Sequence, residues 1–566
     1  MIRRHMSHPG LLAIAATGVL ALGVGACSST PAPSTGGSSN TGASGTLVME
    51  SSPESSITQD FNPFVSTVAP QGMGATGLIY EPLLQFDLAA PPKYYNWLAT
   101  AYSWSNGGKT ITFTIRQGVK WNNGSAMTPA DVAFTYNYVK AHAAINLAGL
   151  QMSSVSTSGN TVTLTFPDPQ YTNLQEIAGV PILPQSVWGS VSDPTTFTDS
   201  TPVGTGPYVL KNFTSQGFTL MKNTKYWQAS QVKIENVFFP VYTSNTGALQ
   251  ALFSGQIDWT GNFIPGLQQQ FVNKAPAYHH FWEAPGSTNA LMPNLHKWPT
   301  NQLAVRKAIS LAINRNLVAS EGEAGLENPI TNTSGITLPT FQAWAGPAAA
   351  DTVSPTGSAS AAQAVLTAAG YKKDSKGFFA LGGKEVAVTL VSPSAYTDYA
   401  EVGSIIAQEL KAAGINANFQ GLTVNAWNAD VADGDFSISE HWSNNGLTPY
   451  NLYDNWLDSS LNPGKNATGD YEGLKAPAMD AALAKLRGDQ SVQAQTADLT
   501  PIMDYVAKNL PVIPITTASE WFEYNSQRFV GWPTQQNAYE TGQPSGTNNG
   551  AGSGTDEVVI LHLKPR

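Results

Sequence analysis

Short stretches of alternating apolar and polar residues dominate the first half of the chain. In residues 110–116 isoleucine and phenylalanine alternate with threonine and arginine, and residues 161–166 repeat this alternation. A period of two residues predicts half-buried strands. Thr128 before a proline, with Asp131 in the first turn, predicts a helix start between the two strands. Together these elements predict a small α+β unit that ends near residue 199.

Further strands and one helix are expected around this unit. The helix is predicted over 246–253, because Gly255 follows it in the position of a C-terminal cap. Runs of β-branched and aromatic residues predict the strands, which are expected at 46–50, 208–210, 218–222, 237–241 and 257–260.

In the second half of the chain the apolar period lengthens, and helices alternate with strands. Residues 303–317 predict an amphipathic helix whose Arg306, Lys307 and Arg315 face outward. The other helices are predicted at 358–369 and 403–413, and the strands at 386–391, 415–420 and 436–439. This alternation is typical of an α/β lobe with a largely parallel sheet.

The segment from Pro202 to Tyr208 reads Pro-Val-Gly-Thr-Gly-Pro-Tyr, and four of its seven residues are Gly or Pro. Such a composition predicts a rigid, tightly turned connection into the strand that starts at Tyr208. A phosphate-binding loop is the alternative interpretation. It is disfavoured because the third glycine, the preceding strand and the following helix are missing.

The chain begins with a targeting segment. Two arginines precede an apolar run at 11–24, which is too short for a stable membrane span. Val24 to Cys27 resembles the bacterial lipobox, which implies cleavage before Cys27, a signal peptide over 1–26, and a lipid on the cysteine sulfur. An ordinary signal peptide with an incidental cysteine is the alternative.

The segment 27–45 combines this cysteine with a Ser/Gly/Thr-rich stretch, which predicts a flexible tether of about 20–25 Å mean reach. We therefore expect an extracytoplasmic protein that is anchored by Cys27 to the outer face of the cell membrane. Cys27 is the only cysteine, so no disulfide within the chain is expected.

Composition narrows the classes of partner. The net charge is −10 and no basic cluster is present, which argues against nucleic acid. Charged residues make up only 12% of the chain, while it contains 14 Trp. This balance suits a site that binds neutral polar ligands by stacking and hydrogen bonds, although a large core would also use many of these rings.

Six short motifs occur in an order and spacing that resemble the family 5 solute-binding proteins. These proteins are receptors of ABC importers for oligopeptides, dipeptides, nickel complexes and some oligosaccharides. The resemblance covers nearly all of residues 46–530, and the motifs are Asn62–Phe64, Tyr80–Leu83, Gly118–Trp121, Pro202–Tyr208, Gly255–Asp258 and Asn294 with Val305–Ser310.

The resemblance implies an α/β bilobal periplasmic-binding-protein fold of type II, with an extra small α+β subdomain in the first lobe. It also implies a monomer that needs no cofactor or metal, with ABC permease subunits as partners and hinges near 286–293 and 508–516. The expected limits are 46–84, 201–290 and 515–566 for lobe I, 85–200 for the small subdomain, and 291–514 for lobe II.

Motifs of catalysis are missing from the sequence. Neither Gly-x-Ser-x-Gly nor His-Glu-x-x-His occurs. Adjacent His279 and His280 point to opposite faces of a strand, which disfavours a metal pair. Asp430, Asp433 and Asp435 resemble a set of glycosidase acids, but a solvated loop is the favoured interpretation. We therefore expect no enzyme, and an anchored hydrolase stays as a remote alternative.

Residues after the predicted strand 436–439 are the best candidates for a binding site. In peptide-binding members an Asp shortly after the matching Trp pairs with the ligand's ammonium group, and Asn445 occupies that position here. An amide lacks the required charge, which puts free-amine peptides in doubt. Residues 446–453 resemble a stretch of cello-oligosaccharide-binding members, which favours a neutral β-linked oligosaccharide over an oligopeptide.

We predict ligand-binding residues in both lobes, with core packing as the alternative for each aromatic ring. Lobe II is expected to contribute Trp442, Asn444, Asn445 and Tyr450. Lobe I is expected to contribute Trp259, Asn262 and Phe263, with Trp427 and Trp521 as weaker candidates.

Overall fold

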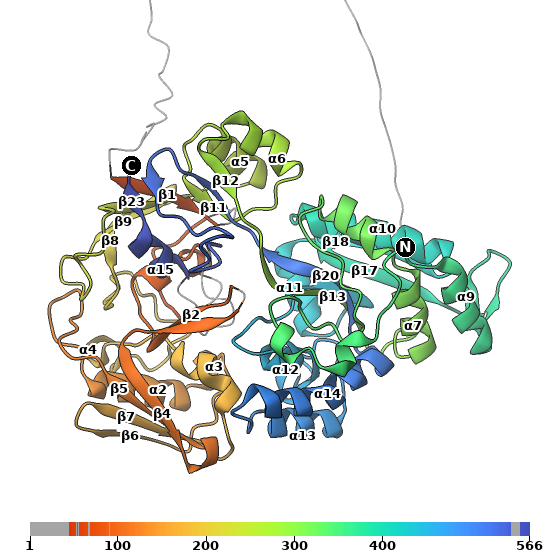
Figure 1. Cartoon of the computed structure of the whole chain (residues 1–566), viewed down its shortest axis with the longest axis horizontal. Helices are drawn as coiled ribbons and strands as arrows, with labels where there is room; N and C mark the ends of the chain where they lie inside the picture. Colours follow the sequence, from red (N-terminus) through yellow and green to blue (C-terminus); the bar gives the residue numbers. More distant parts are fainter. Residues whose placement is uncertain (1–44, 52–53, 55, 66–67, 90, 545–554) are drawn as a thin grey trace, which may run out of the picture. The chain divides into compact units, whose positions relative to one another are not determined.

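The computed structural model describes residues 45–51, 54, 56–65, 68–89, 91–544 and 555–566 of the chain (Figure 1). The predicted signal peptide, Cys27 and nearly all of the predicted tether lie outside the described residues. No helix in the described part of the chain is long and apolar enough to cross a membrane. Three sheets of four or more strands organise the described residues.

A seven-stranded sheet contains β1 at its centre. Its order is β12-β21-β11-β1-β10-β9-β8, and β1 pairs in parallel with β10 and β11, while the other pairs are antiparallel. The strands are β1 (Thr46–Glu50), β8 (Tyr208–Thr214), β9 (Gly217–Lys222), β10 (Asn236–Pro240), β11 (Trp259–Thr260), β12 (His279–Phe281) and β21 (Glu523–Asn525). The helices α5 (Asn245–Phe253) and α6 (Leu267–Gln270) follow β10 and β11. The strands and the helix predicted here are confirmed, although β11 is shorter than expected.

A four-stranded antiparallel sheet lies between β3 and β8 in the sequence. It has the order β4-β5-β7-β6, and Ile111, Phe113 and Ile115 of β5 are all buried, as their alternation predicts. Thr128 and Asp131 form a capping box at the start of α2, which confirms the predicted helix start. The bounds are β4 (Ala99–Ser105), β5 (Thr110–Ile115), α2 (Pro129–Ala141), β6 (Ser154–Ser158) and β7 (Thr161–Thr165).

A five-stranded sheet forms the centre of the second half of the fold. Its order is β18-β17-β19-β13-β20. β17 is parallel to β18 and β19, but β13 is antiparallel to both β19 and β20. The prediction of a largely parallel sheet is therefore wrong for half of the pairs, because β13 and β20 enter from outside the helix–strand alternation. The strands are β13 (Ala284–Pro293), β17 (Ala387–Pro393), β18 (Asn416–Leu422), β19 (Ile438–His441) and β20 (Ile513–Glu520).

Helices precede and follow the strands of this sheet in the sequence. The predicted helix at 403–413 begins six residues earlier, at Thr397. The helices are α7 (Leu303–Ala312), α8 (Arg315–Leu317), α9 (Ala359–Ala368), α10 (Thr397–Ala412), α11 (Val424–Ala432), α12 (Tyr450–Leu457), α13 (Pro477–Leu486) and α14 (Val492–Asn509). The remaining short elements are α1 (Ala69–Gly72), β2 (Leu84–Asp87), β3 (Lys93–Asn96), α3 (Leu174–Ala178), α4 (Gln185–Trp188), β14 (Lys372–Lys373), β15 (Phe379–Leu381), β16 (Lys384–Glu385), β22 (Phe529–Val530), α15 (Thr555–His562) and β23 (Lys564–Pro565).

The chain passes between the seven-stranded and five-stranded sheets at residues 282–283 and 521–522. These residues separate β12 from β13 and β20 from β21. The expected hinge near 286–293 falls within β13, and the one near 508–516 spans the end of α14 and the start of β20. β13 and β20 pair with each other in the five-stranded sheet.

The helix predicted over 303–317 ends early, and two of its arginines are buried. α7 ends at Ala312, and Asn314 caps the short helix α8. Arg306 donates to the carbonyl oxygens of Thr300, Asn509 and Leu510, and Arg315 donates to those of Ser310 and Pro514. The prediction that Arg306 and Arg315 face outward is wrong, because backbone carbonyl groups at 509–514 accept hydrogen bonds from both guanidinium groups.

The segment Pro202–Tyr208 forms the connection into β8, as its composition predicts. A Cβ on Gly204 would lie 1.8 Å from the carbonyl oxygen of Ile79, and a Cβ on Gly206 would lie 2.5 Å from that of Leu78. The amide of Gly206 donates to the same Ile79 oxygen at 2.9 Å. The glycines are therefore required by a close approach of two backbones.

The C-terminal helix α15 packs into the same core as β1 (Figure 1). Val559, Ile560 and Leu563 are fully buried in that core. The Glu557 carboxylate accepts hydrogen bonds from Gln85 Nε2 at 2.6 Å and from the Tyr226 hydroxyl at 3.0 Å.

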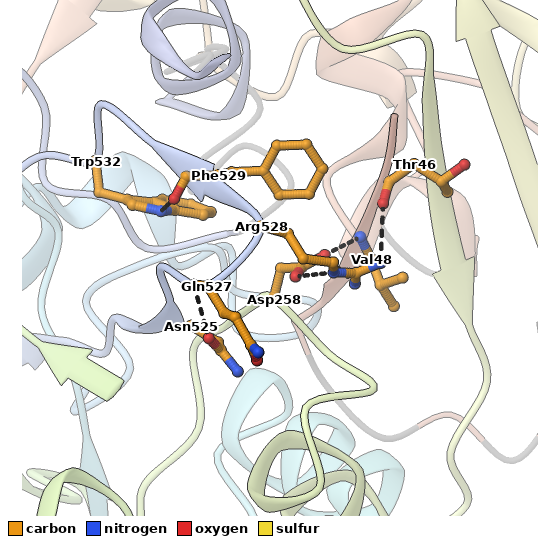
Figure 2. A network of polar contacts seen from close by, with 8 residues as sticks. All are labelled: Thr46, Val48, Asp258, Asn525, Gln527, Arg528, Phe529 and Trp532. Carbon is orange, nitrogen blue, oxygen red and sulfur yellow. Dashed lines mark hydrogen bonds and ion pairs between the residues drawn. The ribbon is translucent and has the colours of Figure 1, made fainter. Parts of the chain in front are cut away.

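Figure 2 shows the polar network that joins the Gly255–Asp258 motif to the C-terminal part of the chain. Arg528 donates to Asp258 through Nε at 2.8 Å and through Nη2 at 2.5 Å, and Val48 N donates to the same carboxylate at 2.8 Å. The Asp258 side chain is only 2% exposed. The motif aspartate therefore links β1, β11 and the segment before β22.

Replacing Asp258 by alanine is expected to lower the free energy of unfolding by about 3 kcal/mol or more, because the change leaves Arg528 and a buried backbone amide without their shared acceptor. Asp435→Ala is the matched control, since its ion pair with Lys297 is exposed and contributes about 0–1 kcal/mol. Urea unfolding of both variants measures the difference. Equal midpoints for the two variants would contradict the prediction.

Candidate ligand-binding site

Aromatic and polar residues follow the carboxyl ends of three neighbouring strands of the five-stranded sheet. β17, β18 and β19 are mutually parallel, so their carboxyl ends lie at one edge. The segments 394–399, 423–427 and 442–445 start there, and we call these residues the binding edge. Ligands of open α/β sheets bind at such edges.

Trp442 is the exposed end of a row of rings at the binding edge. Trp442 is 38% exposed. The centre of its ring lies 4.4 Å from that of His441 and 5.5 Å from that of Trp427. His441 in turn stacks on Trp427 and on Tyr471, both at 4.9 Å. Buried rings thus support one accessible indole face.

Trp427 is fully buried behind Trp442. Its Nε1 donates to Ser439 Oγ at 3.0 Å, which satisfies the indole within the protein. Burial also lowers the pKa of the neighbouring His441 to about 4. Trp427 and His441 therefore position the exposed ring, and Trp442 presents it.

The two asparagines after Trp442 differ in burial. Asn444 is half-buried, whereas Asn445 is buried. Asn445 Oδ1 accepts from the amide of Gly446 at 2.8 Å, and its Nδ2 has no hydrogen-bond partner among the described residues. A buried amide donor without a partner costs free energy unless a ligand supplies an acceptor.

Tyr450 is placed by the structure in a core rather than at the binding edge. It begins α12 and packs with Tyr453 and Trp456 in a hydrophobic cluster. Its hydroxyl donates to Asp454 Oδ1 at 2.5 Å. The side chain of the next residue, Asn451, donates to Glu176 of α3.

The candidates from the seven-stranded sheet fall into two groups. Trp259 is fully buried, and its Nε1 donates to the carbonyl oxygen of Gly542 at 2.7 Å. This ring therefore follows the alternative of core packing. Asn262 follows β11 and donates from Nδ2 to Glu50 Oε2 at 2.6 Å. Phe263 and Trp521 contact each other edge to face at 5.5 Å.

Asn262, Phe263 and Trp521 therefore lie close to one another, near the passage at 521–522. The backbone amide of Asn262 also donates to Glu523 at 3.2 Å, so two buried carboxylates, Glu50 and Glu523, share this asparagine.

Buried carboxylates are the feature that the sequence reasoning missed. In the five-stranded half, four of the buried carboxylates are Glu323, Glu327, Asp398 and Glu440. Burial raises the pKa of Glu327 to about 8 and that of Asp398 to about 6, and it raises the pKa of Glu323 and Glu440 well above the usual range. Their dispersal over 118 sequence positions gives no local motif, and only the Glu323/Glu327 spacing links two of them.

No group of three or more His, Cys, Asp or Glu residues in the described ranges is arranged to hold a metal ion. His279 Nδ1 lies 2.9 Å from the carbonyl oxygen of Phe271, and His280 Nε2 lies 3.1 Å from Ser526 Oγ. The two rings thus have separate partners.

Comparison with solved structures identifies the fold. A mannohexaose-bound periplasmic oligopeptide-binding protein of an ABC transporter from Thermotoga maritima is similar with a TM-score of 0.81 and 22% identity, over 92% of this chain and 99% of that one. NikZ from Campylobacter jejuni in complex with Ni(L-His) gives 0.75 and 18%, over 92% and 100%. These similarities confirm the expected α/β bilobal periplasmic-binding-protein fold of type II.

Two curated relatives illustrate the sequence similarity. The nickel-binding periplasmic protein of Escherichia coli is 31% identical over 269 residues, which are 45% of this chain and 49% of that protein. The periplasmic murein peptide-binding protein MppA of Escherichia coli is 22% identical over 456 residues, which are 75% and 79% of the two chains. The matches to the first three curated relatives span about half of their length, at 49%, 57% and 50%.

A family model matches the central part of the chain. The model for the bacterial extracellular solute-binding proteins, family 5, matches residues 93–463, which is more than half of the chain. The six motifs that carry the resemblance in the sequence lie within or next to this region. The chain therefore belongs to family 5 of the bacterial extracellular solute-binding proteins.

Proposed function

We propose that this protein is the ligand-binding subunit of an ABC importer. It captures a small oligomer between its two lobes, closes over it, and delivers it to the permease subunits in the membrane. It works as a monomer without a cofactor and without catalysis. Family membership and the names of the peptide-binding and nickel-binding relatives support this proposal.

We further propose that Cys27 carries a lipid that anchors the mature chain outside the cell membrane, with residues up to 45 as a tether. The small-residue sequence before Cys27 supports the anchor. We also propose the limits given above for lobe I, its subdomain and lobe II. The membership of the strands in the three large sheets supports these limits, although they divide β13 and β20, which each belong to one sheet.

The proposed ligand is an oligosaccharide, and the observation that carries this choice is the exposed ring of Trp442. A supported indole face matches the apolar face of a sugar ring. Asn444 and Asn445 follow directly and can hydrogen-bond to hydroxyl groups. The mannohexaose bound by the similar Thermotoga protein shows that this fold accepts an oligosaccharide.

An unblocked oligopeptide is the second candidate, favoured by the names of several relatives. Asn445 stands against it, because an amide cannot compensate the charge of a desolvated ammonium group at that position. The two candidates differ in one measurement.

Calorimetric titration of the purified protein with cello-oligosaccharides is expected to show saturable binding, with weaker binding of unblocked tri- and tetrapeptides. The preparation is first unfolded and refolded to remove any co-purified ligand, which mass spectrometry then identifies. Tight peptide binding together with no response to any sugar would overturn the oligosaccharide assignment.

Trp442→Ala is expected to weaken oligosaccharide binding about five- to thirtyfold, because a stacked aromatic ring contributes on the order of 1–2 kcal/mol. Trp104→Ala in β4 is the matched control, since that half-buried ring contacts Tyr171 and lies outside the binding edge. The prediction fails if both variants bind the sugar like the wild type.

A further inference from the structure

Four buried carboxylates from three segments lie at and beside the binding edge. Glu323 and Glu327 follow α8, Asp398 lies in the first turn of α10, and Glu440 lies in β19. The charges of all four carboxylates act on the hydroxyl of Tyr399. Its pKa is raised by burial and then further by the charges of all four carboxylates. We call these four residues the acidic cluster.

Glu323 faces the rest of the acidic cluster without a hydrogen bond. The residue is 1% exposed, and neither carboxylate oxygen has a partner among the residues that the structure describes. The charges that act on it come from Glu327, Asp398 and Glu440. In contrast, Glu327 accepts from Asn289 Nδ2 at 3.0 Å and from Thr516 Oγ1 at 2.7 Å.

Positive charge is missing from the acidic cluster. Across the described ranges, no lysine or arginine forms an ion pair with any of its four members. Buried carboxylates of this kind stay protonated or need a cation, since desolvating an unpaired charge costs several kcal/mol. Both oxygens of Glu323 can still accept hydrogen bonds, so a ligand group that donates hydrogen bonds can satisfy them.

Aromatic rings connect the acidic cluster to the proposed sugar-binding surface. Tyr399 donates from its hydroxyl to Asn289 Oδ1 at 3.1 Å, and its ring lies 6.5 Å from that of Trp442. Tyr396, which is 37% exposed, contacts the Tyr399 ring edge to face at 5.9 Å. The ring of Tyr399 therefore separates a ligand stacked on Trp442 from the carboxylates. Aromatic faces also attract cations.

We propose that the acidic cluster is a subsite for a primary ammonium group, so that the captured oligosaccharide contains an amino sugar. This inference rests on the proposed function and specifies its substrate class. A neutral sugar supplies hydrogen-bond donors to the oxygens of Glu323 but no charge. An ammonium group supplies both, with three donors on one compact cation. The subsite differs from the Asn445 position in sequence and in its elements.

Three β-1,4-linked tetramers that differ only at carbon 2 test this subsite. Cellotetraose carries a hydroxyl group there, the N-acetylglucosamine tetramer a neutral amide, and the glucosamine tetramer an amine. Titration calorimetry at a pH that keeps the amine protonated is expected to show at least about tenfold tighter binding of the glucosamine tetramer than of either neutral one. Equal or tighter binding of cellotetraose overturns the ammonium subsite and leaves the oligosaccharide receptor standing.

Glu323→Gln keeps the shape of the side chain and removes its charge. This variant is expected to bind the three tetramers within about twofold of one another. Glu472→Gln is the matched control, because Glu472 is equally buried, lies outside the acidic cluster, and should leave the preference for the amine intact. A Glu323→Gln protein that keeps the tenfold preference overturns the proposal.

The wild-type series alone decides the matter if the variant fails to fold. If none of the tetramers binds while an unblocked peptide does, the proposed oligosaccharide function fails together with the subsite.

Discussion

The free energy of unfolding is expected to fall as the pH rises from 6.5 to 8. Burial raises the pKa of Glu327 to about 8 and that of Glu520 to about 7, whereas an unfolded chain releases these protons near pH 4 to 4.5. The folded state therefore holds protons that the unfolded state has lost, so rising pH favours unfolding. Each such group contributes about 1.4 kcal/mol per pH unit until its folded-state pKa is reached.

The lower limit of this pH range comes from a group with the opposite sign. The pKa of buried His441 is lowered to about 4, so its contribution to stability increases with pH and is complete above about 6.5. Denaturant titrations at pH 6.5, 7.0, 7.5 and 8.0 and constant ionic strength measure the slope. A stability that rises over this range would contradict the prediction.

Glu327→Gln isolates one contributor to this slope. The amide nitrogen of glutamine cannot accept the hydrogen bonds that Glu327 Oε2 accepts from Asn289 Nδ2 and Thr516 Oγ1, so the variant is expected to be less stable than the wild type at pH 6.5. Its stability should depend less on pH between 7 and 8, because the group with a pKa of about 8 is absent. An unchanged slope would assign the pH dependence to other carboxyl groups.

Gly204→Ala is expected to abolish stable folding or to cost at least about 3 kcal/mol. The new Cβ would lie 1.8 Å from the carbonyl oxygen of Ile79, and no rotamer relieves an overlap with backbone. Ile79 cannot easily retreat, since its oxygen also accepts from Gly206. Soluble yield and thermal unfolding of the variant measure the effect.

Gly77→Ala is the control for this substitution. Gly77 lies two residues from Ile79 in the sequence, and a Cβ there meets no described atom within 4 Å. It should fold with nearly wild-type stability. If Gly204→Ala behaves like Gly77→Ala, the close approach of the two backbones does not constrain the fold.

Local patterns predicted strands and helices in both halves of the chain but not their tertiary roles. The alternation at 110–116 suffices for β5, because its buried and exposed faces repeat every two residues. Arg306 and Arg315 look like the solvent face of a helix, yet distant carbonyl groups at 509–514 make their burial favourable. Similarly, nothing near 284–293 indicates that β13 joins the five-stranded sheet in the antiparallel direction.

Position along the chain placed the proposed site after strand ends, but it did not show which rings are exposed. Trp442 follows a strand end, and the structure leaves its ring accessible, whereas Trp259 and Trp427 have the same side chain and are fully buried. Composition cannot separate these cases, because each ring suits a core as well as a ligand. The acidic cluster was missed because its members come from three segments of the chain that only the complete fold brings together.

The packing of α15 against the core of β1 also affects the order in which the protein can mature. Residues at the two ends of the described chain, such as Met49 and Ile560, complete the same hydrophobic interior. A nascent polypeptide emerges from its N-terminus and lacks α15 until residues 555–562 have been made. The core around β1 therefore stays incomplete while the preceding residues are synthesised, and its apolar surface needs protection until α15 emerges.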